Sequence, residues 1–161
     1  MDYLGIFEQL HKHQVKYLLC GGLAVNIYGI PRMTADIDLI LDFDKDNLKK
    51  FEICVVNAFY QSQIPVSLSL LSTQQERIKL VKEKNLIALS YFNTRGNVMS
   101  MDVLIDVPLN FADMWERKTT RTLDEITIHI VSVNDLIKLK EYSNRKQDLD
   151  DIYLLSQLKN G

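Results

Sequence analysis

The sequence predicts a mixed α/β fold in which helices flank a central sheet. Two strand patterns in the first third of the chain, at residues 16–20 and 35–41, each precede a helical pattern. Two more strand patterns, at 86–92 and 98–107, are joined by a turn at 93–97 and predict a hairpin. Hairpins interrupt the alternation of strands and helices found in a doubly wound sheet, so a mixed sheet is expected.

The elements follow from the spacing of apolar residues, which is near 3.6 in a helix and two in a half-buried strand. Gly21-Gly22 stops the first strand, and Gly29-Ile30-Pro31 stops the short helix after it. Pro65 argues against a regular helix over residues 61–72, which stay unassigned. In chain order we expect helix 2–13, strand 16–20, helix 23–28, strand 35–41, a helix from about 45 to 60, helix 73–84, strands 86–92 and 98–107, helix 111–117, strand 126–131, and helices 133–142 and 146–158.

The helix that runs to about residue 60 has two candidate N-caps, Asp44 and Asp46. An aspartate at this position can accept hydrogen bonds from the free N–H groups of the first helical turn. The inward positions expected from the helical spacing are Leu48, Phe51, Val55 and Phe59.

Composition describes an ordinary globular chain. Its 161 residues predict a single domain, 1–161, that includes the C-terminal helices at about 132–159. The formal net charge of −2 gives no overall basic field for nucleic acid, although a local patch stays open. The two cysteines have no metal-ligand spacing, and the N-terminus shows neither a basic leader nor a membrane-length apolar run. We therefore expect a cytoplasmic protein with reduced thiols.

A glycine pair stands between the first strand and the short helix after it. Gly21-Gly22 would let the backbone approach a ligand closely, and free N–H groups at a helix start suit phosphate oxygens. A tight turn alone would also explain the pair, so both readings stay open.

Acidic residues mark two of the predicted strands. Asp36 and Asp38 are two apart on one strand, so their carboxylates point to the same face, where a divalent cation would relieve their repulsion. Asp102 stands among apolar residues of a later strand and could reach the same cations if the strands are neighbours. Asp106 shares the strand face of Asp102 and is interpreted as a structural residue before Pro108.

Together these residues resemble a known signature. Gly21-Gly22, thirteen further residues, Asp36-Ile37-Asp38 and a later strand aspartate resemble the DNA polymerase β-type nucleotidyltransferases. The stretch 19–25, Gly29, Arg32 and Thr34 resembles the minimal nucleotidyltransferases related to abortive-infection type IV toxins. So does the C-terminal run 131–140, followed by Arg145, Asp148 and Asp151. Residues 60–84 lie outside this resemblance.

The resemblance implies a site and a chemistry. Asp36, Asp38 and Asp102 would be the catalytic residues and the ligands of a two-metal Mg²⁺ site, with Mn²⁺ as an alternative. The NTP would be bound by five residues, namely Gly21, Gly22, Arg32, Thr34 and Lys140. Lys140 could instead serve only to pair with Asp151 or to cap a helix. Relatives often carry Gly-Ser where this chain has Gly21-Gly22, so a hydroxyl that could bind phosphate or metal is missing here.

Three functions follow from the resemblance. The first is a nucleotidyltransferase that moves an NMP from an NTP to an acceptor hydroxyl on RNA, protein or a small molecule and releases pyrophosphate. The second is a toxin–antitoxin component that modifies tRNA or a partner protein and is held by an antitoxin. The third is a catalytically silent module of the same fold that binds a nucleotide or a partner. Retention of all three carboxylates favours activity, and neither the acceptor nor the preferred NTP can be derived from the sequence.

Overall fold

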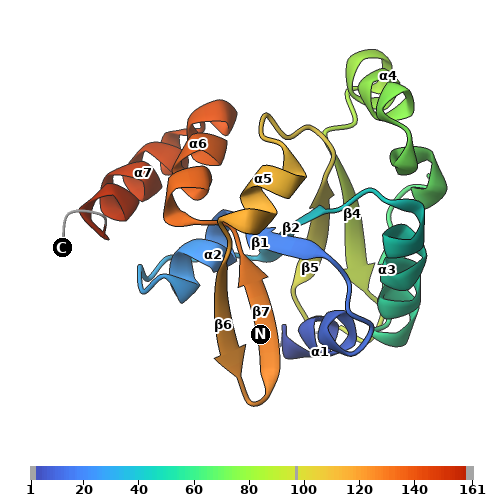
Figure 1. Cartoon of the computed structure of the whole chain (residues 1–161), viewed down its shortest axis with the longest axis horizontal. Coiled ribbons are helices and arrows are strands. Elements are labelled where there is room, and N and C mark those ends of the chain that lie inside the picture. The colour runs from blue at the N-terminus through green and yellow to red at the C-terminus, as the bar shows by residue number, and fades with distance from the viewer. Residues whose placement is uncertain (1–2, 97, 159–161) are drawn as a thin grey trace.

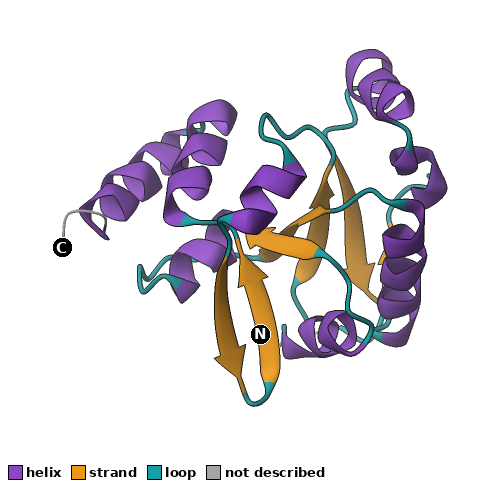
Figure 2. Cartoon of the chain, in the orientation of Figure 1, coloured by secondary structure: helices purple, strands orange, loops and turns teal. Residues whose placement is uncertain are grey.

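The computed structural model describes residues 3–96 and 98–158 (Figures 1 and 2). Its helices are α1 Leu4–Lys12, α2 Gly21–Ile27, α3 Lys45–Asn57, the 3-10 helix η1 Leu68–Ser72, α4 Gln74–Lys84, α5 Phe111–Glu116, α6 Val133–Ser143 and α7 Lys146–Leu158. Its strands are β1 Tyr17–Cys20, β2 Asp36–Leu41, β3 Tyr60–Ser62, β4 Ala88–Asn93, β5 Ser100–Leu104, β6 Thr119–Leu123 and β7 Ile126–Ile130.

The seven strands of the described residues form one mixed sheet in the order β3-β4-β5-β2-β1-β7-β6. The central strand β2 runs antiparallel to β1 and parallel to β5. β1 and β7 are parallel, while the pairs β3/β4, β4/β5 and β6/β7 are antiparallel. The predicted mixed α/β fold is therefore confirmed, and the strand that carries two aspartates lies in the middle of the sheet.

The core forms around the central strands. All four residues of β1 are buried. In β2 and β5 buried residues alternate with partly exposed ones along at least part of each strand, and the fully buried ones include Ile37, Leu39, Met101 and Val103. Burial of a side chain of this size contributes about 1.5–3 kcal/mol. Helix α1 packs against α3 and β7, whereas α6 and α7 pack on each other at the opposite end of the molecule (Figure 1). The core thus fixes β2 and β5 side by side.

The structure settles the helix cap that the sequence left open. Asp44 is the N-cap of α3, and its side chain accepts hydrogen bonds from the backbone N–H groups of Asp46 and Asn47. The prediction for Phe59 was wrong, because α3 ends at Asn57 and Phe59 takes a positive φ of 61° as the chain turns into β3. Phe59 is consequently 41% exposed instead of pointing into the core.

Two strands were not predicted. The three-residue edge strand β3 begins at Tyr60, where the preceding helix was expected to end, and continues into the unassigned stretch 61–72, which also contains η1. β6 carries the threonine-rich sequence TTRTL, which is mostly exposed and lacks the alternation of a half-buried strand. Of the predicted turn at 93–97, Asn97 lies outside the described residues. Every helix in residues 3–96 and 98–158 is too short or too polar to span a bilayer.

Candidate active site

Three carboxylates converge on the centre of the sheet. In the parallel register of β2 and β5, Asp38 lies opposite Asp102 and Asp36 lies opposite Ser100. One carboxylate oxygen from each of Asp36, Asp38 and Asp102 lies within 4.8 Å of the others, and all three residues are half-buried. We call these residues the aspartate triad. The structure thus brings together the three aspartates that were predicted to cluster.

The triad is an electrostatically unfavourable arrangement without a cation. Burial, together with the negative charges of Asp36 and Asp102, raises the pKa of Asp38 from 3.8 to about 6. The charges of Arg145 and Lys140 offset only part of the effect. Within the part of the chain that the structure describes, no lysine or arginine forms an ion pair with any member of the triad. The donor set therefore fits a hard divalent cation, which prefers carboxylate oxygens.

Gly21 is packed directly against the triad. The helix α2 begins at this residue, immediately after β1, and Gly21 has a positive φ of 65°. A Cβ atom added to Gly21 would lie 1.7 Å from Oδ2 of Asp38. Such an approach is incompatible with any side chain, so glycine is required here both by conformation and by space.

Gly22 makes room for a different neighbour. A Cβ atom at Gly22 would lie 2.6 Å from Oγ1 and 2.9 Å from Cβ of Thr34. The Thr34 hydroxyl in turn donates to Oδ1 of Asp36 at 3.3 Å. The side chain of Thr34 therefore occupies the space into which a serine at position 22 would project, and it places a hydroxyl beside the triad.

Lys140 lies beside the triad but is already paired. Its ammonium is 2.6 Å from a carboxylate oxygen of Asp151 and 3.3 Å from one of Asp148, and the residue is 3% exposed. Arg32 also pairs with Asp151, and Arg145 pairs with Asp148 at 3.1 Å. In this network Lys140, Asp148 and Asp151 are buried, whereas the Arg145 side chain is 73% exposed. Its three cations and two carboxylates keep one net positive charge next to the nucleotide-binding candidates. The pairing of Lys140 with Asp151 matches the structural alternative left open from the sequence, and the two roles are compatible.

Two residues of this region were missed from the sequence as site residues. Arg145 contributes a cation whose charge reaches Asp38, and Asp148 accepts from Ser143 at 2.6 Å and from Arg145. A signal was present, because Asp148 and Asp151 are three apart on one helix and face the same side.

A pocket of about 590 Å³ contains the triad and the glycine pair. One part of its wall is formed by the paired cations Arg32, Lys140 and Arg145. Another part is apolar and includes Ile87, Leu104 and Leu139. Asp106 also lines this pocket, and its Oδ2 accepts a hydrogen bond from the Tyr142 hydroxyl at 2.9 Å.

Comparison with known proteins identifies the fold. No protein-family model matches the sequence, and no curated protein sequence matches it either. Solved structures do match over nearly the whole chain. ANT(2″)-Ia in complex with adenylyl-2″-tobramycin has a TM-score of 0.60 at 11% identity, over 96% of this chain and 85% of that one.

Two further structures agree with this match. The lincosamide antibiotic adenylyltransferase LnuA, bound to lincomycin, also has a TM-score of 0.60, at 13% identity over 95% of this chain and 93% of that one. A candidate nucleotidyltransferase from Thermotoga maritima has a TM-score of 0.52 at 14% identity, over 96% of this chain and 88% of that one. The chain thus has the nucleotidyltransferase fold.

Proposed function

We propose that this protein is a metal-dependent nucleotidyltransferase that moves an NMP from an NTP to an acceptor hydroxyl and releases pyrophosphate. The observation that carries the proposal is the aspartate triad, whose oxygens lie within 4.8 Å of one another without a cationic partner among the described residues. It stands against a glycine turn, in a fold shared with adenylyltransferases. A non-catalytic module would have no need to keep three repelling carboxylates together.

The triad would divide the work of the reaction. Asp36, Asp38 and Asp102 would hold Mg²⁺, or Mn²⁺ in its place, which supplies Lewis-acid stabilisation of the triphosphate charge. Asp102 accepts the proton of the acceptor hydroxyl while the oxygen of that hydroxyl attacks the α-phosphorus. A bond forms between the acceptor oxygen and the α-phosphorus, and the bond from this phosphorus to the bridging oxygen breaks. Pyrophosphate carries away the electron pair of that bond.

The nucleotide would lie along the glycine turn. Gly21 and Gly22 let the triphosphate approach the backbone. The Thr34 hydroxyl would take the place of the serine hydroxyl that nucleotidyltransferases resembling this chain often have at the position of Gly22. Arg32, Lys140 and Arg145 keep a net positive charge near the phosphates, while Asp148 and Asp151 hold these cations in place.

The acceptor is proposed to be a small molecule that carries a hydroxyl group. The three cations on the pocket wall share the two carboxylates of Asp148 and Asp151. The one net positive charge that remains is less than the row of basic groups that binds an RNA backbone. Its apolar part and its volume of about 590 Å³ suit a compact organic acceptor. The solved relatives are bound to adenylyl-2″-tobramycin and to lincomycin, which supports an antibiotic-like acceptor.

A toxin–antitoxin component is the second candidate. Helix α7 exposes Leu149 and Tyr153 at 59% and 65%, and such side chains favour contact with a protein partner. In that case the acceptor would be tRNA or a protein, and an antitoxin would cover the toxin.

An acceptor panel tests this proposal. The protein would be incubated with Mg²⁺ and each of the four NTPs, together with tobramycin, lincomycin or total tRNA, and products would be analysed by mass spectrometry. We expect an NMP adduct on a small hydroxyl compound. An adduct on tRNA alone would establish the second candidate instead. The variant carrying both Asp36→Asn and Asp38→Asn serves as the inactive control.

A further inference from the structure

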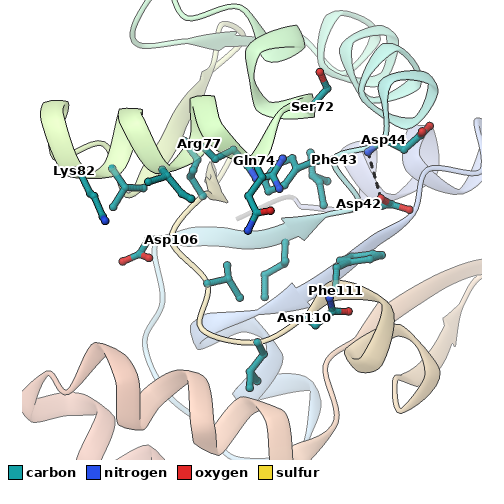
Figure 3. Close-up of a pocket in the computed structure, with 17 residues that line it drawn as sticks. Asp42, Phe43, Asp44, Ser72, Gln74, Arg77, Lys82, Asp106, Asn110 and Phe111 are labelled. Atoms are coloured by element: carbon teal, nitrogen blue, oxygen red, sulfur yellow. Dashed lines mark hydrogen bonds between the residues drawn. The ribbon is translucent and has the colours of Figure 1, made fainter.

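A second pocket, of about 640 Å³, lies between α4 and the ends of β2 and β5 (Figure 3). Asp106 lines both this pocket and the one that contains the triad, but the glycine pair and the triad itself line only the latter. The volume is within the usual range for a site that binds a small molecule. None of the residues that the sequence indicated for nucleotide binding lines it.

One wall of this second pocket is cationic. Arg77 and Lys82 come from α4, and neither forms an ion pair within the described residues. The Arg77 guanidinium lies over the Phe43 ring at 4.8 Å and donates to the Leu71 carbonyl. Burial lowers the pKa of Arg77. A half-buried guanidinium with unused N–H donors is suited to bind a carboxylate.

Three carboxylates follow the ends of β2 and β5 and also line the pocket. Asp42 and Asp44 lie on one side of it, and Asp106 lies on the same side of the view as Lys82 (Figure 3). Each of these carboxylates accepts one or two hydrogen bonds within the fold. Asp42 accepts from the backbone N–H of Asp44, and Asp44 accepts from the first turn of α3. Asp106 accepts from the Tyr142 hydroxyl. Each carboxylate still has lone pairs that can accept from an ammonium group. Within the described chain no ion pair joins Arg77 or Lys82 to these carboxylates.

The apolar part of the lining includes Ile105, Val107 and Phe111, and we call it the floor of the pocket. We propose that this pocket is a binding site for a small zwitterion with an apolar or aromatic side group. Its carboxylate would contact Arg77, its ammonium would face the strand-end carboxylates, and its ring would lie on the floor. A purely anionic ligand would meet three carboxylates, and a purely cationic one would meet Arg77 and Lys82, so both charges are required.

The chain contains its own reporter for this site. Trp115 is the only tryptophan of the sequence, and its ring stacks on that of Phe111 with 5.8 Å between centroids. A ligand that covers Phe111 changes the surroundings of the indole. Tryptophan emission therefore reports occupancy of this pocket and does not depend on nucleotide transfer.

Three probes that share a phenyl ring but differ in charge test whether both the carboxylate and the ammonium group are needed for binding. The whole chain would be titrated with L-phenylalanine, with N-acetyl-L-phenylalanine (an anion) and with L-phenylalaninamide (a cation). We expect saturable binding of L-phenylalanine at about millimolar concentration, and binding about tenfold weaker or worse for each analogue. The proposal is overturned if either analogue binds as well as L-phenylalanine, or if no probe produces a saturable change.

A matched pair of variants locates the response. Arg77→Gln should abolish the binding of L-phenylalanine. Arg95→Gln should leave it unchanged, since Arg95 also stacks on a phenylalanine, Phe59, at 3.3 Å but lies outside the pocket. Circular dichroism checks that both variants fold. Wild-type affinity in a folded Arg77→Gln protein would contradict the assignment, whereas the wild-type probe series stands even if that variant unfolds.

Discussion

A Cβ atom on Gly21 would lie 1.7 Å from Oδ2 of Asp38. The start of α2 and the middle of β2 are thus so close that only glycine fits between them. This contact joins the turn proposed to face the triphosphate to the carboxylate proposed to hold its cation. The glycine pair and the Asp36–Asp38 motif, fifteen residues apart in sequence, are therefore parts of one structure.

Gly21→Ala should disrupt the site through two effects, the backbone strain of a positive φ and the collision of the new Cβ atom with Asp38. Gly29 provides the matched control, because it also has a positive φ, of 92°, but a Cβ atom there would meet nothing within 4 Å. Gly29→Ala should cost about 1 kcal/mol of unfolding free energy and keep the thermal shift produced by Mg²⁺ and ATP. Gly21→Ala should cost more and lose that shift. Equal behaviour of the two variants in thermal melts would refute the predicted contact.

Gly22→Ser should be tolerated only when Thr34 is reduced in size. The serine Cβ would lie 2.9 Å from Cβ of Thr34, so the single variant should lose about 1–3 kcal/mol through overpacking. Adding Thr34→Gly removes the collision with Thr34 and leaves room for the serine hydroxyl beside Asp36, while the flexible side chain of Arg32, whose Cζ would lie 3.1 Å from the serine Cβ, can shift. A double-mutant cycle in urea should show a favourable coupling of about 1 kcal/mol or more. Strictly additive effects would mean that the two residues do not share this space.

The stability of the metal-free protein should fall as pH rises from about 4 to about 6. The pKa of Asp38 is about 6 in the fold, against 3.8 as its ordinary value. The folded state therefore binds more protons than the unfolded state in this pH window. The contribution of Asp38 to stability is fully present below pH 3.8 and is lost as its carboxyl group ionises in the folded state. The loss is at most about 3 kcal/mol. In EDTA, Asp38→Asn should match the wild type near pH 4 and exceed its stability at pH 7.5. Parallel curves would contradict the predicted ionisation.

Asp148 should show the opposite pH dependence. Burial raises its pKa, but hydrogen bonds from Ser143 and Arg145 and the charge of Lys140 outweigh burial and lower the pKa from 3.8 to about 2. The contribution of Asp148 to the free energy of unfolding is present above pH 3.8 and is lost as the pH falls toward 2. Asp148→Asn should therefore be less stable than the wild type by about 1.5 kcal/mol at neutral pH, and the difference should shrink in acid. Urea titrations at several pH values measure the difference in unfolding free energy between the two proteins. A difference that grows in acid would contradict the prediction.

Much of the site could be predicted because its signals are local. The two-residue spacing of Asp36 and Asp38 on a strand determines that they share a face, and Asp102 is conspicuous within an apolar strand. The parts that could not be predicted depend on tertiary packing. Nothing near Gly22 in the sequence shows that Thr34 fills the space beside it, and the exposed threonines of β6 give no strand pattern. Phe59 fits the helical spacing of α3 but lies beyond the end of that helix.

The most direct test follows the fate of each phosphate. Wild type and Asp102→Asn would be incubated with Mg²⁺ and ATP labelled at either the α- or the γ-phosphate, together with the acceptor found in the panel. The account predicts that α-label enters the acceptor while γ-label leaves as pyrophosphate, since attack occurs at the α-phosphorus. Asp102→Asn should reduce this incorporation by about a hundredfold or more while the nucleotide-dependent thermal shift is largely retained. Transfer of the γ-label to the acceptor, or full activity in the Asp102→Asn variant, would contradict the account.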